Sequence, residues 1–238
     1  MDVSGFDQYV VERICVVDEY DKHSKCIVDA VVNNEDFQEF LSNHPVGSKE
    51  ICASVENEIV FCGTIRSIQS VCTYLRTNVH IEAYSFTDVL DSEIHNRVFQ
   101  NPDKTYSQVN TFFADKKVKI DCVEEGLGNE KIKGFMVQHN ETDYEFLKRL
   151  YNRAGFHLFA DARKRNLCLL EIGTKRKIGK ASVDSNDIKT FKRTIYGSYE
   201  EIELCSAKIF EVGSELEVFK GVYTIISRTI ESKYEDLR

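Results

Sequence analysis

Short segments rich in valine and isoleucine recur along most of this 238-residue chain, with turn residues between them. β-branched residues favour extended backbone because their side chains pack well on a pleated surface. Many short strands with few helices indicate an antiparallel sheet or barrel. The predicted strands are 10–17, 25–32, 50–55, 58–67, 79–86, 118–123, 135–139, 156–160, 166–172, 187–193, 201–209, 215–219 and 221–231.

One helix is predicted with particular clarity, at 142–154. Either Asn140 or Thr142 can cap its start, because Asp143 and Glu145 lie three residues after them and complete a capping box. Gly155 suits the left-handed residue that ends many helices. Shorter helices are expected at 34–41 and 106–113. The apolar arc of the main helix consists of Tyr144, Phe146, Leu147, Leu150, Tyr151 and Ala154.

The charge balance argues against general affinity for nucleic acid, and no specific nucleic-acid binding is expected. The net charge is −8 at pH 7, whereas neutralising phosphates requires a basic face. The two basic runs, 163–165 and 175–177, border predicted strands and are interpreted as solvated turns.

Cysteine spacing predicts buried free thiols in a reducing compartment. None of the eight cysteines forms a CxxC pair, and most lie inside apolar runs. The first 20 residues lack the pattern of a signal peptide, and no apolar run reaches 18 residues. The chain is therefore expected to be made and folded in the cytosol, without membrane insertion.

The catalytic and cofactor-binding motifs that the sequence approaches are incomplete, so neither an enzyme nor a cofactor is predicted. The dinucleotide pattern started by Gly126 and Gly128 has Lys131 where its third glycine should be. The glycines of a possible phosphate loop, Gly173 and Gly179, are one residue too far apart. The six histidines are scattered without metal-ligand spacing. No catalytic residues and no metal ligands are predicted.

An internal sequence repeat suggests two related β units. Residues 46–48 and 212–214 both read Val-Gly-Ser, and 66–70 resembles 228–232. Chance similarity between two β-hairpins is the alternative. If the repeat is real, the chain folds the same kind of barrel twice.

The segment 136–159 resembles a signature shared by VgrG spike proteins of type VI secretion and tail hub (late control D) proteins of contractile phages. Weaker likeness extends over about 20–235. The chain departs from VgrG proteins by ending at Arg238, without an oligonucleotide-binding-type barrel or a β-helical needle. The signature positions that match are Gln138, Asn140, Glu141, Thr142, Asp143, Phe146, Leu147, Arg149, Leu150 and Gly155.

The resemblance implies a phage tail hub-like, mainly β (α+β) fold, with two similar antiparallel β-barrel units and a small helical insert. The expected divisions are 1–95 for the first barrel unit, 96–157 for the insert and 158–238 for the second unit, and the units can share strands. It also implies a homotrimer that joins a six-fold tail tube protein to a separate three-fold spike or needle protein. Such a hub assembles in the bacterial cytoplasm and then belongs to the tail or injection particle.

Within this interpretation the 142–154 helix is a structural pin. Phe146, Leu147 and Leu150 are expected to pack inward, with Asp143 capping the helix start. Arg149 either pairs with a carboxylate across a domain or subunit boundary or remains a solvated charge. Two other functions stay open: an adaptor that binds effector or spike proteins, and a tail-associated cysteine hydrolase.

Overall fold

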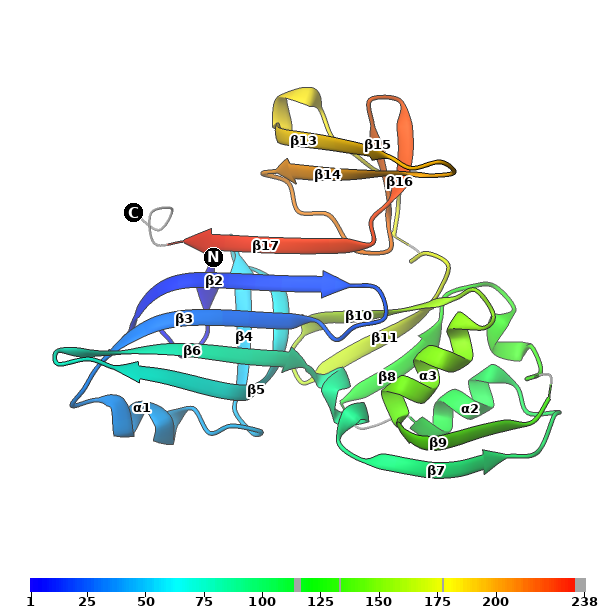
Figure 1. Ribbon diagram of the computed structural model, residues 1–238, viewed down its shortest axis with the longest axis horizontal. Coiled ribbons are helices and arrows are strands. Elements are labelled where there is room, and N and C mark those ends of the chain that lie inside the picture. The colour runs from blue at the N-terminus through cyan, green and yellow to red at the C-terminus, as the bar shows by residue number, and fades with distance from the viewer. Residues whose placement is uncertain (114–116, 133, 177, 234–238) are drawn as a thin grey trace.

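A computed structural model describes residues 1–113, 117–132, 134–176 and 178–233. Its largest element is a strongly curved, fully antiparallel seven-stranded sheet (Figure 1). The last of its strands comes from the far end of the sequence and pairs with one from the beginning. In spatial order the strands are β1 (Asp2–Val3), β4 (Glu50–Val55), β5 (Glu58–Cys72), β6 (Arg76–Ser85), β3 (Lys25–Asn33), β2 (Val10–Glu19) and β17 (Ser227–Lys233).

The side chains of this sheet alternate between core and surface, as the period of a half-buried strand requires. In β3 every second residue from Cys26 to Val32 is buried, and β6 shows the same alternation from Thr77 to Ser85. The short helix α1 (Phe37–Asn43) covers part of the core through Phe40, which is fully buried. Apolar alternation in the sequence therefore set the inward face.

The middle of the chain forms an α/β insert beside the large sheet (Figure 1). Two helices, α2 (Tyr106–Phe113) and α3 (Asp143–Asn152), pack beside an antiparallel pair and a three-stranded sheet. One continuous hydrophobic core runs through the large sheet and the insert. The remaining elements are η1 (Phe86–Asp91), β7 (Ile94–Phe99), β8 (Val118–Cys122), η2 (Leu127–Asn129), β9 (Met136–Thr142), β10 (His157–Lys164) and β11 (Leu167–Gly173).

A small all-β unit follows β11 and has its own minor core. The buried residues of that minor core are Val183, Leu216 and Val218. The unit lies at the top of Figure 1, beyond β17. Its elements are β12 (Ala181–Ser182), η3 (Ser185–Asp187), β13 (Ile188–Ile195), β14 (Glu200–Ser206), β15 (Glu215–Val218) and β16 (Gly221–Thr224).

The two Val-Gly-Ser segments enter hairpins of the same construction. The Gly47 N–H donates to the carbonyl of Ile65 at 2.8 Å, and the Gly213 N–H donates to the carbonyl of Ile225 at 2.8 Å. Both glycines have φ above +80°, a conformation that only glycine adopts easily.

The tips of these two hairpins also match. Glu56 and Asn57 join β4 to β5 with φ of 50° and 68°, and Phe219 and Lys220 join β15 to β16 with φ of 46° and 71°. Two successive positive φ angles are those of the tight turn that suits the twist of a hairpin. The closing hydrogen bonds span 47–65 in one hairpin and 213–225 in the other, so the second hairpin is the shorter one.

The prediction of a mainly β, α+β fold with a small helical insert is confirmed. Several details differ. The predicted strand 221–231 is divided at Ile226 into β16 and β17, which belong to different sheets. The strand β7 was not predicted, and two pairings, β8 with β11 and β12 with β15, are parallel. The predicted divisions 1–95, 96–157 and 158–238 stay a prediction. Among the described residues, no helix combines the length and hydropathy needed to cross a bilayer.

Candidate functional site

The signature residues meet at the corner where β9 turns into α3. Thr142 is the N-cap: its Oγ1 accepts from the Glu145 N–H at 3.1 Å, while the Glu145 carboxylate accepts from the Thr142 N–H at 3.0 Å. The capping box therefore uses Thr142 and Glu145, one of the two pairs that the sequence allowed. Asn140 instead lies at a bulge with φ of 53°, where its N–H donates to the Asn96 side chain.

Gln138 and Asp143 link this corner to β7. Gln138 is fully buried, and its Nε2 donates to the Asp143 carboxylate at 2.9 Å and to the Glu141 carbonyl at 3.2 Å. Its Oε1 accepts from Arg97 at 3.1 Å, and Arg97 also forms an ion pair with Asp143. Buried polar atoms are retained at low cost when they are hydrogen-bonded. The prediction that Asp143 caps the helix is therefore wrong: the cap is Thr142, and Asp143 anchors the helix start to a neighbouring strand.

Arg149 is bound inside the insert. Its Nε and Nη2 donate to the two Glu141 carboxylate oxygens at 2.8 and 2.9 Å, and Nη2 also donates to the Val137 carbonyl at 2.6 Å. A bidentate guanidinium–carboxylate pair fixes geometry as well as charge. The predicted pairing across a domain boundary is therefore wrong within this chain, because Glu141 lies only eight residues away.

The apolar signature residues pack as expected. Phe146 and Leu147 have no exposed surface and Leu150 has almost none. The Phe146 ring lies 5.2 Å from that of Phe99 and 5.5 Å from that of Phe113. Ala154 was placed on the same arc but is exposed, because the helix ends at Asn152. Gly155 has φ of 81°, as expected for the residue that ends a helix.

Beside the signature lies a group that sequence reasoning missed. His23 is held between Thr87 Oγ1 and Asp91 Oδ2, each at 2.8 Å, and Thr142 donates to the other oxygen of Asp91. Asp91, His23 and Thr87 have the residue types of a catalytic acid, base and hydroxyl nucleophile, in that order. Thr87, however, is fully buried and does not line the adjacent surface hollow, so its hydroxyl has no access for a substrate. The group clamps the β2–β3 turn to η1 and α3.

Four of the free thiols lie in surroundings that disfavour reactivity. Burial raises the pKa of the Cys15, Cys26, Cys122 and Cys168 thiols, which disfavours the nucleophilic thiolate. Cys72 and Cys205 are exposed rather than buried. The prediction that the cysteines are buried free thiols is therefore wrong for these two.

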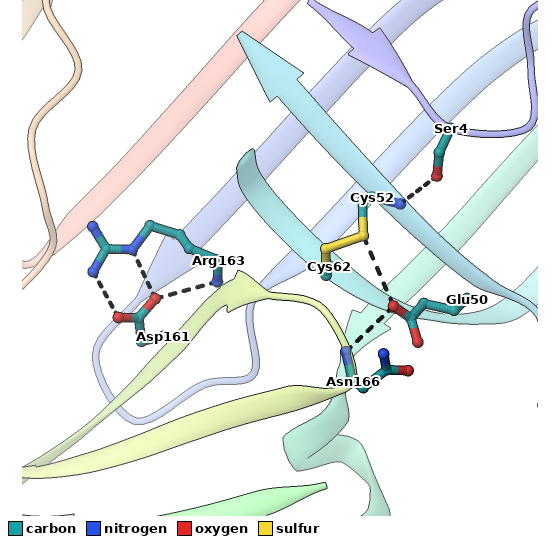
Figure 2. Close-up of a disulfide and its surroundings, with 7 residues drawn as sticks. All are labelled: Ser4, Glu50, Cys52, Cys62, Asp161, Arg163 and Asn166. Atoms are coloured by element: carbon teal, nitrogen blue, oxygen red, sulfur yellow. Dashed lines mark hydrogen bonds and ion pairs between the residues drawn. A yellow bond between two sulfur atoms is a disulfide. The ribbon is translucent and has the colours of Figure 1, made fainter. Parts of the chain in front are cut away.

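The prediction of free thiols is also wrong for Cys52 and Cys62, because these two residues form a disulfide. The two residues lie directly opposite each other on β4 and β5, with Cα atoms 4.1 Å apart, a pairing that only the strand register reveals. Figure 2 shows the disulfide beside the β10–β11 turn, where the Asn166 N–H donates to Glu50 at 3.4 Å. Glu50 and the two cysteines are the one metal-type cluster among the described residues, and both sulfurs are already bonded to each other.

Comparison with known proteins gave matches at the level of structure. No family model matched the sequence, and no curated protein matched it. The c3393 protein of E. coli, a type VI secretion component similar to the T4 tail proteins gp27 and gp5, superposes with a TM-score of 0.73 at 12% identity, covering 98% of this chain and 73% of the other.

Two further structures agree with this match. The 43 kDa tail protein of prophage MuSo2 from Shewanella oneidensis has a TM-score of 0.67 at 11% identity, covering 94% of this chain and 89% of the other. A chain of the Francisella PdpA-VgrG complex has a TM-score of 0.52 at 14% identity, covering 79% and 30%. The chain has a tail hub-like fold.

Within this tail hub-like fold, a cluster of buried charges joins the small β unit to the rest. The Arg176 side chain is only 5% exposed and forms ion pairs with Asp161, Glu171 and Glu211. Arg228 in β17 pairs with Asp18 in β2 and with Glu211 at 3.2 Å. The run 175–177 is therefore not a solvated turn at Arg176, and Lys177 lies outside the described residues.

The run 163–165 also departs from a solvated turn at its first residue. Arg163 donates from Nε and Nη2 to the Asp161 carboxylate at 2.7 and 2.6 Å, and its Nη1 lies 2.9 Å from Glu211 (Figure 2 shows the Asp161 pair). Asp161 lies only two residues away, but Glu211 comes from a distant part of the sequence, so its pairing with Arg163 leaves no local signal. The guanidinium groups of Arg163 and Arg176 are therefore occupied by carboxylates of the protein itself.

Proposed function

We propose that this chain is a structural hub or baseplate component of a contractile injection system, such as a phage tail, a phage-derived bacteriocin or a type VI-like secretion system. Three copies would adapt a six-fold tube to a three-fold spike. The observation that carries the proposal is the repeated hairpin construction at Gly47 and Gly213, in a fold shared with tail and type VI secretion proteins.

The repeat gives a physical reason for the stoichiometry. A chain with two related hairpins presents two related surfaces, so three copies around a three-fold axis present six. A six-fold tube can contact these six surfaces in nearly equivalent ways. The spike then meets the three-fold symmetry of the whole ring, and no other adaptor is required.

The proposed partners are further copies of this chain, the tail tube protein and a separate spike or needle protein. The role is structural rather than enzymatic, because the polar groups of the signature corner are occupied in holding β9, α3 and β7 together. The hub would assemble in the bacterial cytoplasm and function within the tail or injection particle.

Light scattering on the purified chain tests this proposal, combined with electron microscopy. We expect a mass three times the chain mass of 27.4 kDa and ring-shaped particles with three-fold symmetry. Immobilised rings should capture tube protein from the same system. A chain that stays monomeric at high concentration and captures only effector proteins would favour the adaptor function instead.

A further inference from the structure

The β13–β14 ribbon projects from the molecule with little of its surface covered. Neither strand contains a buried residue, and the five consecutive residues 189–193 are all exposed. Within the part of the chain that the structure describes, no other strand pairs with the outer edge of β13 or of β14. Two-stranded ribbons are marginally stable in water, and open strand edges attract further strands.

The two strands of this ribbon carry opposite charges. β13 contains three basic residues and no acidic one, whereas β14 contains three acidic residues and no basic one. The pairs Lys192–Glu203 and Arg193–Glu200 show that bases and acids of adjacent strands meet at contact distance, 2.6 and 2.5 Å. The ribbon therefore has one basic outer edge and one acidic outer edge.

Large apolar side chains are exposed around the same ribbon. Ile195 is 71% exposed, and the stacked rings of Tyr196 and Tyr199 lie at the loop that joins the two strands. A cluster of this kind on a protein surface marks an interaction site more often than a solvated one. The exposed apolar residues of the ribbon and the adjoining hairpin are Phe191, Ile195, Tyr196, Tyr199, Phe219 and Val222.

We propose that the ribbon is the self-association surface: the basic edge of β13 in one copy pairs with the acidic edge of β14 in a second copy. The new pair is antiparallel and continues the alternation of the ribbon, so that each added strand places bases beside acids. This inference rests on the self-association in the proposed function and specifies which surface performs it.

A second copy fits better than a different protein because each edge of the ribbon complements the other edge. A foreign partner would need to match one charge only and would leave the opposite edge open. Head-to-tail pairing of two different surfaces is heterologous, and such contacts close into rings when the rotation between copies permits it. Closing the ring covers every outer edge of every ribbon.

Zero-length cross-linking with a carbodiimide tests the contact directly. Equal amounts of unlabelled and ¹⁵N-labelled full chain are mixed, dissociated, reassembled and cross-linked, and the peptides are analysed by mass spectrometry. We expect mixed-isotope links that join Lys189 or Lys192 to Glu201 or Glu203. The link between Lys192 and Glu203 within one copy, whose charged groups are 2.6 Å apart, is the internal positive control.

Charge reversal tests the energetic role of the two edges. Lys189→Glu with Lys192→Glu should raise the concentration of half-assembly at least tenfold. The control, Lys119→Glu with Lys164→Glu, makes the same charge change at exposed sites outside the ribbon and should shift it less than twofold. Glu201→Lys with Glu203→Lys should weaken assembly in the same way. A chain that carries all four reversals again has opposite charges within each ribbon and between copies, so it should assemble, which an unfolded ribbon could not do.

The outcomes separate the two proposals. If the wild-type chain forms rings but yields no mixed-isotope links between β13 and β14, and both reversed variants assemble normally, the ribbon is not the interface and the proposed function stands. If the wild-type chain remains monomeric at every concentration, both the self-association and this surface are overturned.

Discussion

Asp161 is the centre of the buried charge cluster. Burial alone would oppose its ionisation, but hydrogen bonds and charge from Arg163, together with the charge of Arg176, outweigh that cost and hold the pKa of the Asp161 carboxyl well below its ordinary range. A buried charge is tolerated only while its partner remains. Each member of the cluster is therefore costly to remove singly, and Arg176 more so than any exposed cation.

Replacing Asp161 with asparagine should lower the free energy of unfolding by about 1.5–3 kcal/mol at pH 7, because Arg163 and Arg176 would lose charged hydrogen bonds, although Arg176 keeps its other carboxylate partners. Urea titration measures this loss. Asp103→Asn is the control, since its ion pair with Lys131 is exposed to water. It should leave the urea midpoint unchanged, and a similar midpoint for the two variants would contradict the structural role of the cluster.

The same substitution should change the response to acid. A carboxyl with a depressed pKa in the folded state stabilises the protein above its unfolded pKa, and this stabilisation is lost as pH falls through the folded pKa. The difference in stability between wild type and Asp161→Asn should therefore be constant above roughly pH 5 and shrink below roughly pH 4, the ordinary range of an aspartate. Denaturation at several pH values checks the direction, and a gap that widens in acid would be inconsistent with it.

At the scale of elements, the start of α3 depends on one hydroxyl. Thr142→Ala removes both the helix cap and the bond to Asp91, so the free energy of unfolding should fall by about 1–2 kcal/mol. Thr142→Ser retains the hydroxyl and should recover most of the loss. Thermal and urea denaturation of the three proteins measure the difference. Equal losses in the two variants would show that the hydroxyl is not the cause.

Leu147→Ala tests the burial of the same helix. The side chain is fully buried, so its truncation should cost about 2–5 kcal/mol, from lost transfer energy and the cavity left behind. Lys148→Ala, at the next position on the half-exposed side of the helix, is the matched control. A cost for Leu147→Ala below about 1 kcal/mol in a urea titration would place the helix outside the core.

A feature could be predicted from the sequence where the residues that determine it lie close together in the chain. The helix at α3 was predictable because Thr142, Glu145 and the apolar arc lie within one short segment. The disulfide was not, since only the register of β4 and β5 sets Cys52 opposite Cys62. The His23 clamp and the Arg176 cluster join distant residues of ordinary types. The strand β7 was missed because its outward positions include Ile94 and Val98, which blur the expected alternation.

At the scale of the whole molecule, stability is unevenly distributed. One large core spans the seven-stranded sheet and the insert, whereas the minor core of the small β unit contains only three buried apolar side chains among the residues described there. The charge cluster of Arg176 and Arg228 supplies much of the remaining attachment. Segments with few buried contacts open at lower free energy than the global unfolding transition.

Hydrogen exchange on the dilute, unassembled chain should reveal this difference. We expect the backbone amides of β13 to β16 to exchange well before those of β3 and β6, whose neighbours are strands on both sides. Mass spectrometry of peptides from the two regions measures the rates under identical conditions. Uniform protection across both regions would mean that the small unit opens only with the entire molecule.

The pairing of β17 with β2 has a consequence for how the protein is made. Residues 10–19 leave the ribosome well before residues 227–233, which cover one side of them. At about 5–20 residues per second, the roughly 200 intervening residues take on the order of 10–40 s to synthesise. During that interval one edge of β2 stays unpaired and can pair with strands of neighbouring nascent chains on the polysome. A chaperone that shields this edge would raise the yield of correctly folded chains.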